Sequence, residues 1–297
     1  MLAGPDAAQL ILVSSDARQL TLRVKDVNNL PYPGVSVQVS SAMGAPLLAT
    51  SNADGQVSFN WTAGQSLSAR IVGAAGASVF VNAAAGPPFS FNAPVNAASG
   101  APGLSPGGIA TIFGANLTKG IRAAAPFPWP LSLAGVQILL DGKPAPVLFV
   151  SDSQVNFLAP GELSVGSVKL AVVAAGVEAE LPAPAPVTLV SPGIFFDAAT
   201  GYGSILNAGT TLTTTDQPAA RGDYGEIYAT GLGPAGLTPE VTIGGSRANV
   251  TYSGLAPGYL GLYQVDAQIP SGIAPGDQTL SLTIDGVPSN VVKIGVR

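Results

Sequence analysis

The stretch PAARGDYGEIYATGLGP, residues 218–234, contains the tripeptide Arg-Gly-Asp at residues 221–223. Integrins recognise this tripeptide where a protruding loop leaves both charged side chains free. Here it is followed at once by YGEIYATG, in which larger side chains alternate with Gly, Ile and Ala, the period of a β-strand. We therefore expect a structural role at the mouth of a strand, with Gly222 making the turn and Arg221 pairing locally or capping carbonyl groups. Whether Asp223 is exposed beside Arg221 is a question for the structure.

Three glycines at the end of this stretch, Gly231, Gly233 and Gly236, complete a G-x-G-x-x-G. A dinucleotide site needs this pattern between a strand and a helix, because the helix N-terminus binds the pyrophosphate. The strand-like GEIYAT precedes the glycines, but LTPEVTIGG follows them, with Pro239 and then another strand. We expect the glycines to permit a tight exit from the strand, and we predict no cofactor.

Two pairs of carboxylates are close enough in sequence to act together. Glu178 and Glu180 share one face of a predicted strand, and Asp223 and Glu226 lie near each other. Either pair could contribute to a Ca²⁺ site or to an acid–base couple. Neither has the dense spacing of oxygen ligands in a calcium-binding loop. We expect solvated strand faces at both places, and we predict no metal site and no catalytic residue.

Aromatic residues are the best candidates for binding a ligand. APFPWP places Phe127 and Trp129 among three prolines, where a rigid loop can hold the rings outward for sugar stacking or for a protein interface. Tyr259 and Tyr263 lie in or beside a second loop, GLAPGYLG. The alternative is that these rings cover the ends of β-sandwiches or the joint between domains.

The composition excludes several kinds of chemistry. The chain has 297 residues, and neither cysteine nor histidine occurs among them. A disulfide, a thiolate nucleophile, a Ser-His-Asp triad and a His-ligated metal are therefore impossible. The formal net charge is −5 with no cluster of Lys or Arg, which argues against nucleic acid or an anionic membrane as partner. No apolar run is long enough to span a bilayer, so we expect a soluble protein.

The elements that position these residues are expected to be short strands. The chain contains 37 Gly and 26 Pro, interleaved with short runs of Val, Ile, Leu and Thr. In QLTLRVKD, which begins at Gln19, apolar residues alternate with Thr, Arg and Lys, as in a half-buried strand. Asp54-Gly55 between two strand-like runs predicts a hairpin. The Pro- and Gly-dense residues 86–108 mark a boundary after the first domain.

An internal repeat fills the rest of the chain. Gln154 to Gly176 aligns without a gap onto Gln264 to Gly286, with glutamine, valine, proline, glycine and leucine at matched positions. Upstream, FGANL matches YATGL, and LLDGKPAPVLFV matches TIGGSRANVTYS. Two copies of one sandwich domain therefore follow the first domain. The loops that contain the candidate aromatic residues are insertions, one in each copy.

The repeated block resembles the immunoglobulin-like IPT/TIG domain. GLSPGGIATIFGANL, SPGIF and ARGDYGEIYATGLGP, with other motifs over about residues 96–297, are similar to an uncharacterised C-terminal region of many predicted secreted proteins of Solibacter and related Acidobacteria. In that family an Arg-Gly commonly occupies the entry of the strand. VKDVNNLPYPGVSVQVSS with TSNADGQVSFNWTAG resembles the bacterial Ig-like repeats of invasin and intimin-type surface proteins. These resemblances imply tandem β-sandwiches, an extracellular location, and a scaffolding or binding role without catalytic residues.

We therefore predict an all-β protein of three tandem immunoglobulin-like β-sandwich domains, at residues 1–92, 93–190 and 191–297. The predicted function is that of a non-enzymatic scaffold or adhesion module, secreted or at the cell surface, that binds proteins or other copies of itself. Self-association would use the N-terminal stretch or an exposed edge strand. The alternative is a carbohydrate-binding accessory region of a larger secreted protein. MLAGPDAAQL lacks the features of a signal peptide, as the mature start of a secreted protein or a fragment would. The expected partner is a protein or polysaccharide, without nucleic acid, cofactor, metal or membrane insertion.

Overall fold

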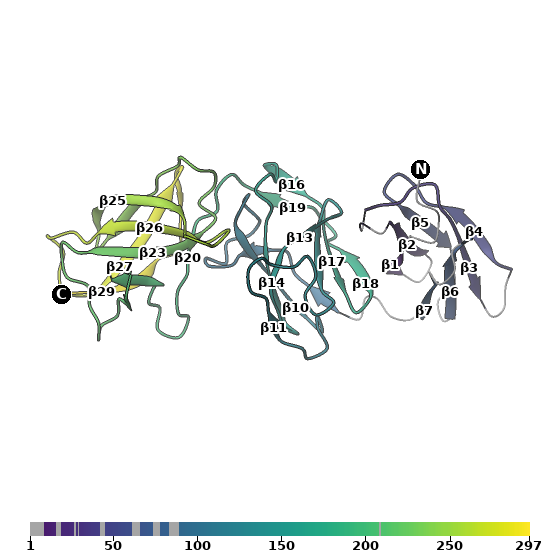
Figure 1. Cartoon of the computed structure of the whole chain (residues 1–297), viewed down its shortest axis with the longest axis horizontal. Helices are drawn as coiled ribbons and strands as arrows, with labels where there is room; N and C mark the ends of the chain where they lie inside the picture. The colour runs from purple at the N-terminus through teal and green to yellow at the C-terminus, as the bar shows by residue number, and fades with distance from the viewer. Residues whose placement is uncertain are drawn as a thin grey trace.

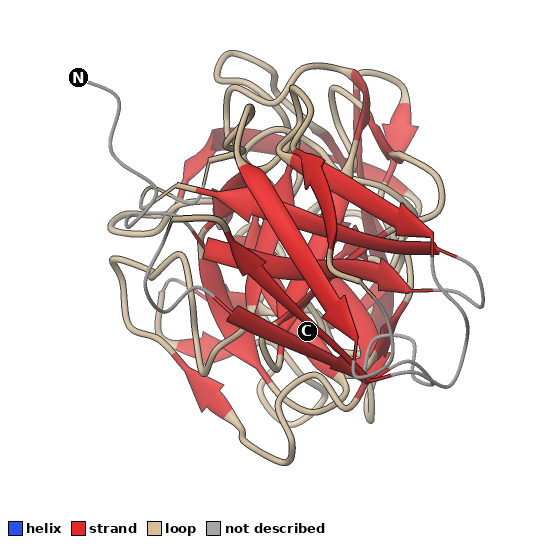
Figure 2. Ribbon diagram, turned by 90° about the vertical axis from the view of Figure 1, so that its right-hand side faces the viewer, coloured by secondary structure: helices blue, strands red, loops and turns tan. Residues whose placement is uncertain are grey.

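The structure is a computed structural model of the whole chain. It describes residues 9–15, 19–26, 28, 30–41, 45–60, 66–73, 78–82, 89–207 and 209–297. Within these ranges the chain forms strands β1 to β29 and no helix, so none of the described residues provides a helix that could cross a membrane. Figure 2 shows the strands joined by turns and loops. The predicted all-β class is confirmed.

The chain forms three β-sandwich units that lie in a row (Figure 1). Each unit has its own hydrophobic core, built from residues between Leu10 and Ile71, between Phe89 and Val187, and between Val190 and Val296. We call these the first, second and third units. The immunoglobulin-like sandwich fold in tandem is confirmed. The boundaries at residues 92/93 and 190/191 stay predictions, and the N-terminal residues 1–8 and part of the predicted boundary segment lie outside the described residues.

The first unit packs two sheets face to face. One sheet contains β1, β2 and β5, and the other has the order β4-β3-β6-β7. The alternation predicted from Gln19 onward is confirmed, because Leu20, Leu22 and Val24 are all fully buried between the sheets. The strand is not half-buried, however, since Arg23 and Lys25 on its other face are also buried, at the junction with the second unit. The strands are β1 (Gln9–Ser15), β2 (Gln19–Lys25), β3 (Ser36–Ser41), β4 (Leu47–Thr50), β5 (Gln56–Asn60), β6 (Ser66–Ile71) and β7 (Ser78–Asn82).

The hairpin predicted at Asp54-Gly55 is wrong. The turn forms, with Gly55 at a φ of 71° and its amide donating to Asn52 O at 2.9 Å. The strands on either side of the turn, however, pair in different sheets, β4 with β3 and β5 with β2. A turn signal identifies the change of direction but does not distinguish a hairpin from a crossing between the layers of a sandwich.

The second unit also has two main layers. One has the order β13-β12-β17-β18, and the other has the order β11-β14-β15-β10-β8. Its strands are β8 (Ser90–Phe91), β9 (Val95–Asn96), β10 (Ile109–Ala115), β11 (Ala123–Ala124), β12 (Gln137–Leu140), β13 (Lys143–Ala145), β14 (Val147–Val150), β15 (Gln154–Leu158), β16 (Gly166–Val168), β17 (Leu170–Ala174), β18 (Val177–Glu180) and β19 (Ala185–Val187).

The third unit repeats this plan, as the sequence repeat predicts. Phe113 lies opposite Gln154 in the second unit, and the matched residues Tyr228 and Gln264 lie opposite each other in the third. The strands are β20 (Gly193–Ile194), β21 (Ile205–Asn207), β22 (Thr211–Leu212), β23 (Tyr224–Thr230), β24 (Glu240–Ile243), β25 (Ser246–Leu255), β26 (Tyr263–Gln268), β27 (Gly276–Ile284), β28 (Val287–Pro288) and β29 (Val292–Val296).

The two repeats differ where the chain passes between layers. In the third unit β25 is one long strand that pairs with β24 at its start and with β26 along the rest. The second unit has two strands there, β13 and β14, separated by Pro146. Proline has no amide hydrogen to donate to a sheet, so it interrupts the strand. The matched residue in the third unit is Asn249, which continues it.

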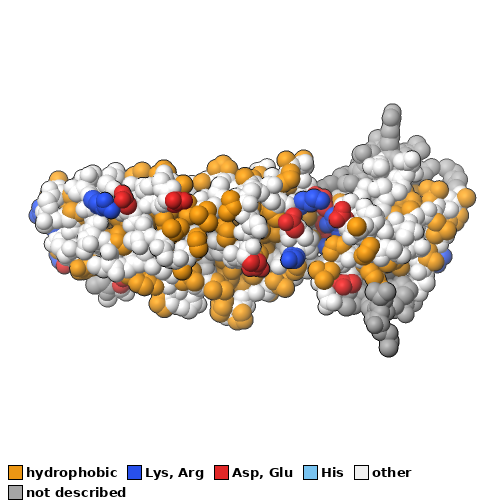
Figure 3. All heavy atoms as spheres, turned by 90° about the horizontal axis from the view of Figure 1, so that it is seen from above, with side chains coloured by type: hydrophobic (Ala, Val, Ile, Leu, Met, Phe, Trp, Pro, Cys, Tyr) orange, Lys and Arg blue, Asp and Glu red, His pale blue; other side chains and the backbone are white. Residues whose placement is uncertain are grey.

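The first and second units share a sheet. Strand β1 pairs in parallel with β18 at Leu12 and Val177, which joins one layer of each unit into the order β13-β12-β17-β18-β1-β2-β5. Val177 packs against the cores of both units. In Figure 3 charged side chains gather where these two units meet.

Candidate ligand-binding site

The Arg-Gly-Asp tripeptide has the structural role predicted for it. Gly222 makes the turn before β23 with a φ of 92°. The guanidinium of Arg221 donates from Nε to Arg297 O and from an Nη to Ile273 O, both at 3.3 Å. Asp223 is exposed, which answers the question left open by the sequence. Because Arg221 is held against backbone carbonyl groups, the two charged side chains are not presented together on a free loop tip.

The G-x-G-x-x-G lies in the loop between β23 and β24, residues 231–239, which we call the glycine loop. A strand follows it, as predicted, and not a helix. A Cβ added at Gly231 would lie 2.0 Å from Ser191 O, and one added at Gly233 would lie 3.0 Å from Leu189 O. The glycines therefore let this loop pack closely against the segment that connects the second and third units.

The expectation of a solvated strand face is wrong for Glu178, whereas Glu180 is exposed. Glu178 is fully buried at the junction with the first unit, where its carboxylate pairs with Arg23 and lies 2.7 Å from Lys25 Nζ. The side chain of Glu180 is 33% exposed and also pairs with Arg23. Two cations of β2 thus neutralise two carboxylates of β18. The physical reason is the shared sheet, which brings β2 of the first unit within side-chain reach of β18 of the second, with only β1 between them.

The second carboxylate pair, Asp223 and Glu226, is not brought together as a cation site. Asp223 lies at the turn, whereas Glu226 lies on the outer face of β23, opposite Asp266 of β26. The described part of the chain contains no group of three or more acidic residues placed to hold a metal ion.

The structure separates the four candidate aromatic residues into three places. Phe127 and Trp129 meet edge to face, with ring centroids 5.6 Å apart, and Phe127 is 51% exposed. Tyr259 is 54% exposed at the tip of the loop after β25. Tyr263, only four residues later, turns into the junction between the second and third units. Their role in binding stays a prediction.

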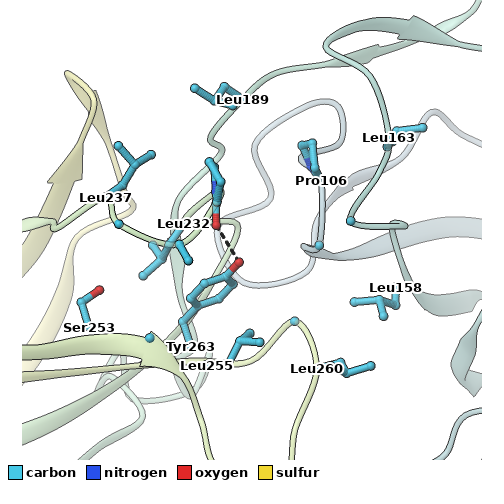
Figure 4. Close-up of a pocket in the computed structure, with 18 of the residues that line it drawn as sticks. Pro106, Leu158, Leu163, Leu189, Leu232, Leu237, Ser253, Leu255, Leu260 and Tyr263 are labelled. Carbon is cyan, nitrogen blue, oxygen red and sulfur yellow. Dashed lines mark hydrogen bonds between the residues drawn. The ribbon is translucent and has the colours of Figure 1, made fainter.

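A cavity of about 550 Å³ lies at this junction, and we call it the junction cavity. Figure 4 shows leucine side chains from both units around it, together with Tyr263. The second unit supplies Pro106, Leu158 and Leu163, and the connecting segment supplies Leu189. From the third unit come the glycine loop and the loop between β25 and β26. Its volume is within the range of pockets that bind small molecules or single large side chains.

The chemistry of the junction cavity is apolar and uncharged. No charged residue occurs among the described residues that line it, and Ser253 and Tyr263 are the polar side chains there. The Tyr263 hydroxyl donates to Gly233 O at 2.8 Å, and burial raises the pKa of this hydroxyl above its ordinary 10.0. Tyr263 thus remains protonated at neutral pH and fixes the glycine loop, leaving apolar surface for a ligand.

Four large apolar side chains of this cavity remain exposed to solvent. Val165 is 60% exposed, and Leu189, Leu255 and Leu260 are each more than 40% exposed. Exposed apolar groups gathered around a concavity are typical of a binding site. Phe127 and Trp129 are absent from the described residues that line the junction cavity.

Sequence reasoning found Tyr263 but missed the junction cavity. Its walls come from two units and from the segment between them, and their residues are ordinary leucines, glycines and prolines. The sequence did contain one indication of this cavity, the glycine loop. Three glycines followed by Pro239 indicate that the loop backbone lies close to another segment.

No protein-family model matches the chain, and no curated protein matches it in sequence. Among solved structures, SGBP-B of the Bacteroides ovatus mixed-linkage glucan utilization locus, in complex with a mixed-linkage heptasaccharide, is 16% identical over 97% of this chain with a TM-score of 0.32. Invasin, a bacterial integrin-binding protein, is 13% identical over 98% of this chain with a TM-score of 0.20. A titin tandem is 9% identical over 97% of it, also with a TM-score of 0.20.

The chain spans 66% of SGBP-B, 59% of invasin and 98% of the titin tandem. It spans 34% and 30% of two plexin A4 extracellular regions. At these identities and TM-scores, the likeness carries no information on ligands or partners.

Proposed function

We propose that the chain is a non-enzymatic scaffold, secreted or at the cell surface, whose junction cavity binds an apolar side chain of a partner protein. The observation that carries the proposal is the junction cavity itself, an uncharged apolar concavity of about 550 Å³ between two packed units. The division into domains at residues 1–92, 93–190 and 191–297 belongs to this proposal, and the three separate cores support it.

A binding site between two units requires that the units do not separate, and buried hydrogen bonds support this. Asn96 of the second unit is buried and donates from Nδ2 to Ser191 O at 2.6 Å. Thr230 of the third unit is fully buried, and its hydroxyl oxygen accepts from the Ile109 amide at 2.8 Å. That hydroxyl donates to Gly261 O, next to the cavity, at 2.6 Å. Opening the junction would exchange these buried hydrogen bonds for bonds to water, at a net cost of about 0.5–1.5 kcal/mol each, which supports a cavity that exists before the ligand binds.

The cavity lining indicates what kind of group binds. Without a charged residue it offers no compensation for burying a charge, so an ionic ligand would lose hydration energy. An apolar ligand would instead cover the exposed side chains of Leu189, Leu255 and Leu260. Burial of apolar surface contributes about 25 cal/mol of binding free energy per Å². A leucine, phenylalanine or tryptophan side chain from a peptide loop fits this chemistry, as single anchors do in protein interfaces.

The test is selection of phage-displayed random peptides on the full chain, followed by measurement of their affinities. We expect the selected peptides to share a large apolar residue. A Gly161→Trp variant should then weaken their binding about tenfold or more, because it places an indole in the cavity. Gly161 lines the cavity, its φ is not positive, and a Cβ there meets no atom within 4 Å.

Gly272→Trp is the matched control. A Cβ at Gly272 also meets no atom within 4 Å, but this residue lies outside the cavity lining. Its variant should bind the selected peptides as the unsubstituted protein does. Selected peptides without a common apolar residue, or equal affinities for the two variants, would contradict the proposal. Sedimentation velocity run alongside would reveal whether a second copy of the chain is the occupant.

A further inference from the structure

We infer that the outer face of β23, β26 and β25 binds a neutral polysaccharide chain, at a site separate from the junction cavity. The face consists of Tyr224, Glu226 and Tyr228 from β23, Gln264 and Asp266 from β26, and Tyr252 from β25. We call these six residues the tyrosine face.

Strand geometry places the six side chains on one surface. In β23 the alternate residues Gly225, Ile227 and Ala229 are buried in the core, so Tyr224, Glu226 and Tyr228 point outward. Strand β26 alternates in the same way. The register then sets the neighbours, because Tyr228 lies opposite Gln264, and Glu226 lies opposite Asp266.

Strand β25 adds the third tyrosine. Tyr252 lies opposite Asp266 on the other side of β26, just after a β-bulge. Tyr224 is 43% exposed and Tyr252 is 41% exposed. The two carboxylates thus have Tyr252 beside them on the neighbouring strand β25, and Tyr224 and Tyr228 on either side of Glu226 along β23. Neighbouring strands of a sheet are about 4.8 Å apart.

Four of the six side chains are held in place by one another, whereas the Tyr252 hydroxyl donates to Leu255 O at 3.0 Å. The Tyr228 hydroxyl donates to Glu226 Oε2 at 3.3 Å, and Gln264 Nε2 donates to Asp266 Oδ1 at 2.9 Å. Burial and the Glu226 carboxylate raise the pKa of Tyr228, so this hydroxyl keeps its proton. Each carboxylate has a second oxygen that can accept from a hydroxyl group of a ligand.

The second unit shows that this chemistry is specific to the third. Its matched cross-strand pairs are Phe113 with Gln154 and Thr111 with Asn156. Glutamine is the same in both repeats, but the third unit has tyrosine for phenylalanine, glutamate for threonine and aspartate for asparagine. The repeat framework therefore does not require the tyrosine face, which adds acceptors and hydroxyl groups to it.

The ligand class follows from the combination of groups. Tyrosine rings stack on the apolar faces of sugar rings. Carboxylates accept hydrogen bonds from sugar hydroxyls, and side-chain amides both donate to them and accept from them. None of the six residues is cationic, so an anionic sugar has no partner here. Tyr224 and Tyr228 are four residues apart on one strand, about 13 Å at about 3.3 Å per residue. That separation suits an extended chain and exceeds a single sugar.

Affinity electrophoresis of the full chain tests the inference. The net charge of −5 lets the protein migrate in native gels cast with hydroxyethyl cellulose, galactomannan or dextran as probes. We expect retardation by at least one probe. Tyr224→Ala and Tyr252→Ala should each weaken binding about tenfold, while Tyr224→Phe and Tyr252→Phe, which keep the ring, should stay near the unsubstituted affinity.

Phe113→Ala is the matched control, because Phe113 is 48% exposed at the position of the second unit that matches Tyr228, and it should leave retardation unchanged. Trp129→Ala removes the other candidate for sugar stacking. Thermal unfolding of each variant separates loss of binding from loss of fold. Retardation by none of the three probes, or retardation that Trp129→Ala abolishes and the tyrosine variants do not, would overturn the inference. Binding of poly-L-lysine without any neutral probe would overturn it in favour of a cationic peptide, and Glu226→Gln would then abolish that binding.

Discussion

Lys25 and Glu178 belong to different units, and their charged groups meet 2.7 Å apart with both side chains fully buried. Arg23 pairs with the same carboxylate. Removing the Glu178 carboxylate leaves Lys25 buried without a partner of opposite charge, whereas Arg23 keeps its pairing with Glu180. We predict that Glu178→Ala lowers the free energy of unfolding of the joined first and second units by about 3–5 kcal/mol, measured by urea denaturation.

An exposed pair provides the control for this prediction. Arg247 Nη2 lies 3.0 Å from Glu240 Oε1, and the two side chains are 73% and 62% exposed. Solvent screens such a pair, so Glu240→Ala should cost less than about 1 kcal/mol. Equal losses in the two variants would show that the junction cluster does not stabilise the fold.

Lys25 also makes stability depend on pH. Burial lowers its pKa below the ordinary 10.5, against an opposing effect of Glu178. The unfolded chain therefore binds more protons than the folded chain at pH values between the two pKa values. The free energy of unfolding is expected to rise with pH in the range that ends at 10.5. Urea denaturation over this range should show a smaller slope for Lys25→Met and an unchanged slope for the exposed Lys143→Met.

Strand β2, which contains Lys25, shows what can and cannot be predicted from the sequence. Alternation in β2 predicted correctly which residues form the core of the first unit, because a period of two identifies the two faces of a strand. It also placed Arg23 and Lys25 together on the other face. Their partners on that face are the carboxylates of β18, two strands away in the shared sheet and more than a hundred residues away in sequence, and no local pattern encodes this pairing.

The candidate site was likewise predictable only in part. Aromatic residues in the loop inserted in the third unit were identified from sequence, but Tyr259 and Tyr263 looked equivalent there. Four residues separate them, and a loop can turn successive side chains in any direction. Only the packing of the second unit against the third places Tyr263 in the junction cavity and leaves Tyr259 in solvent.

The Thr230 hydroxyl is expected to couple the second and third units. It accepts from the Ile109 amide and donates to Gly261 O. Thr230→Val keeps the shape but leaves both backbone groups buried without a partner, so we predict a loss of about 1–3 kcal/mol in the free energy of unfolding. Thr230→Ser keeps the hydroxyl and should lose less, by urea denaturation. A valine variant as stable as the serine variant would contradict the role of this hydroxyl.

Two residues of the glycine loop distinguish the energetic cost of close packing from the cost of backbone strain. Gly231 has a φ of 75°, and a Cβ there would lie 2.0 Å from Ser191 O. Gly236 has a φ of 100°, and a Cβ there meets no atom within 4 Å. Gly236→Ala should therefore cost only the strain of positive φ, about 1–2 kcal/mol.

Gly231→Ala has the same strain and also an overlap between its Cβ and a backbone oxygen of the connecting segment. Such overpacking should lower the free energy of unfolding by about 1–3 kcal/mol beyond the loss in Gly236→Ala. Gly231→Ala should also weaken binding of the peptides selected for the junction cavity, since relief of the overlap moves the glycine loop away from Leu189. Thermal unfolding and peptide affinity of the two variants test this. If both alanines cost the same and neither changes peptide affinity, the glycines serve only the turn, and the close approach of loop and connecting segment does not shape the cavity.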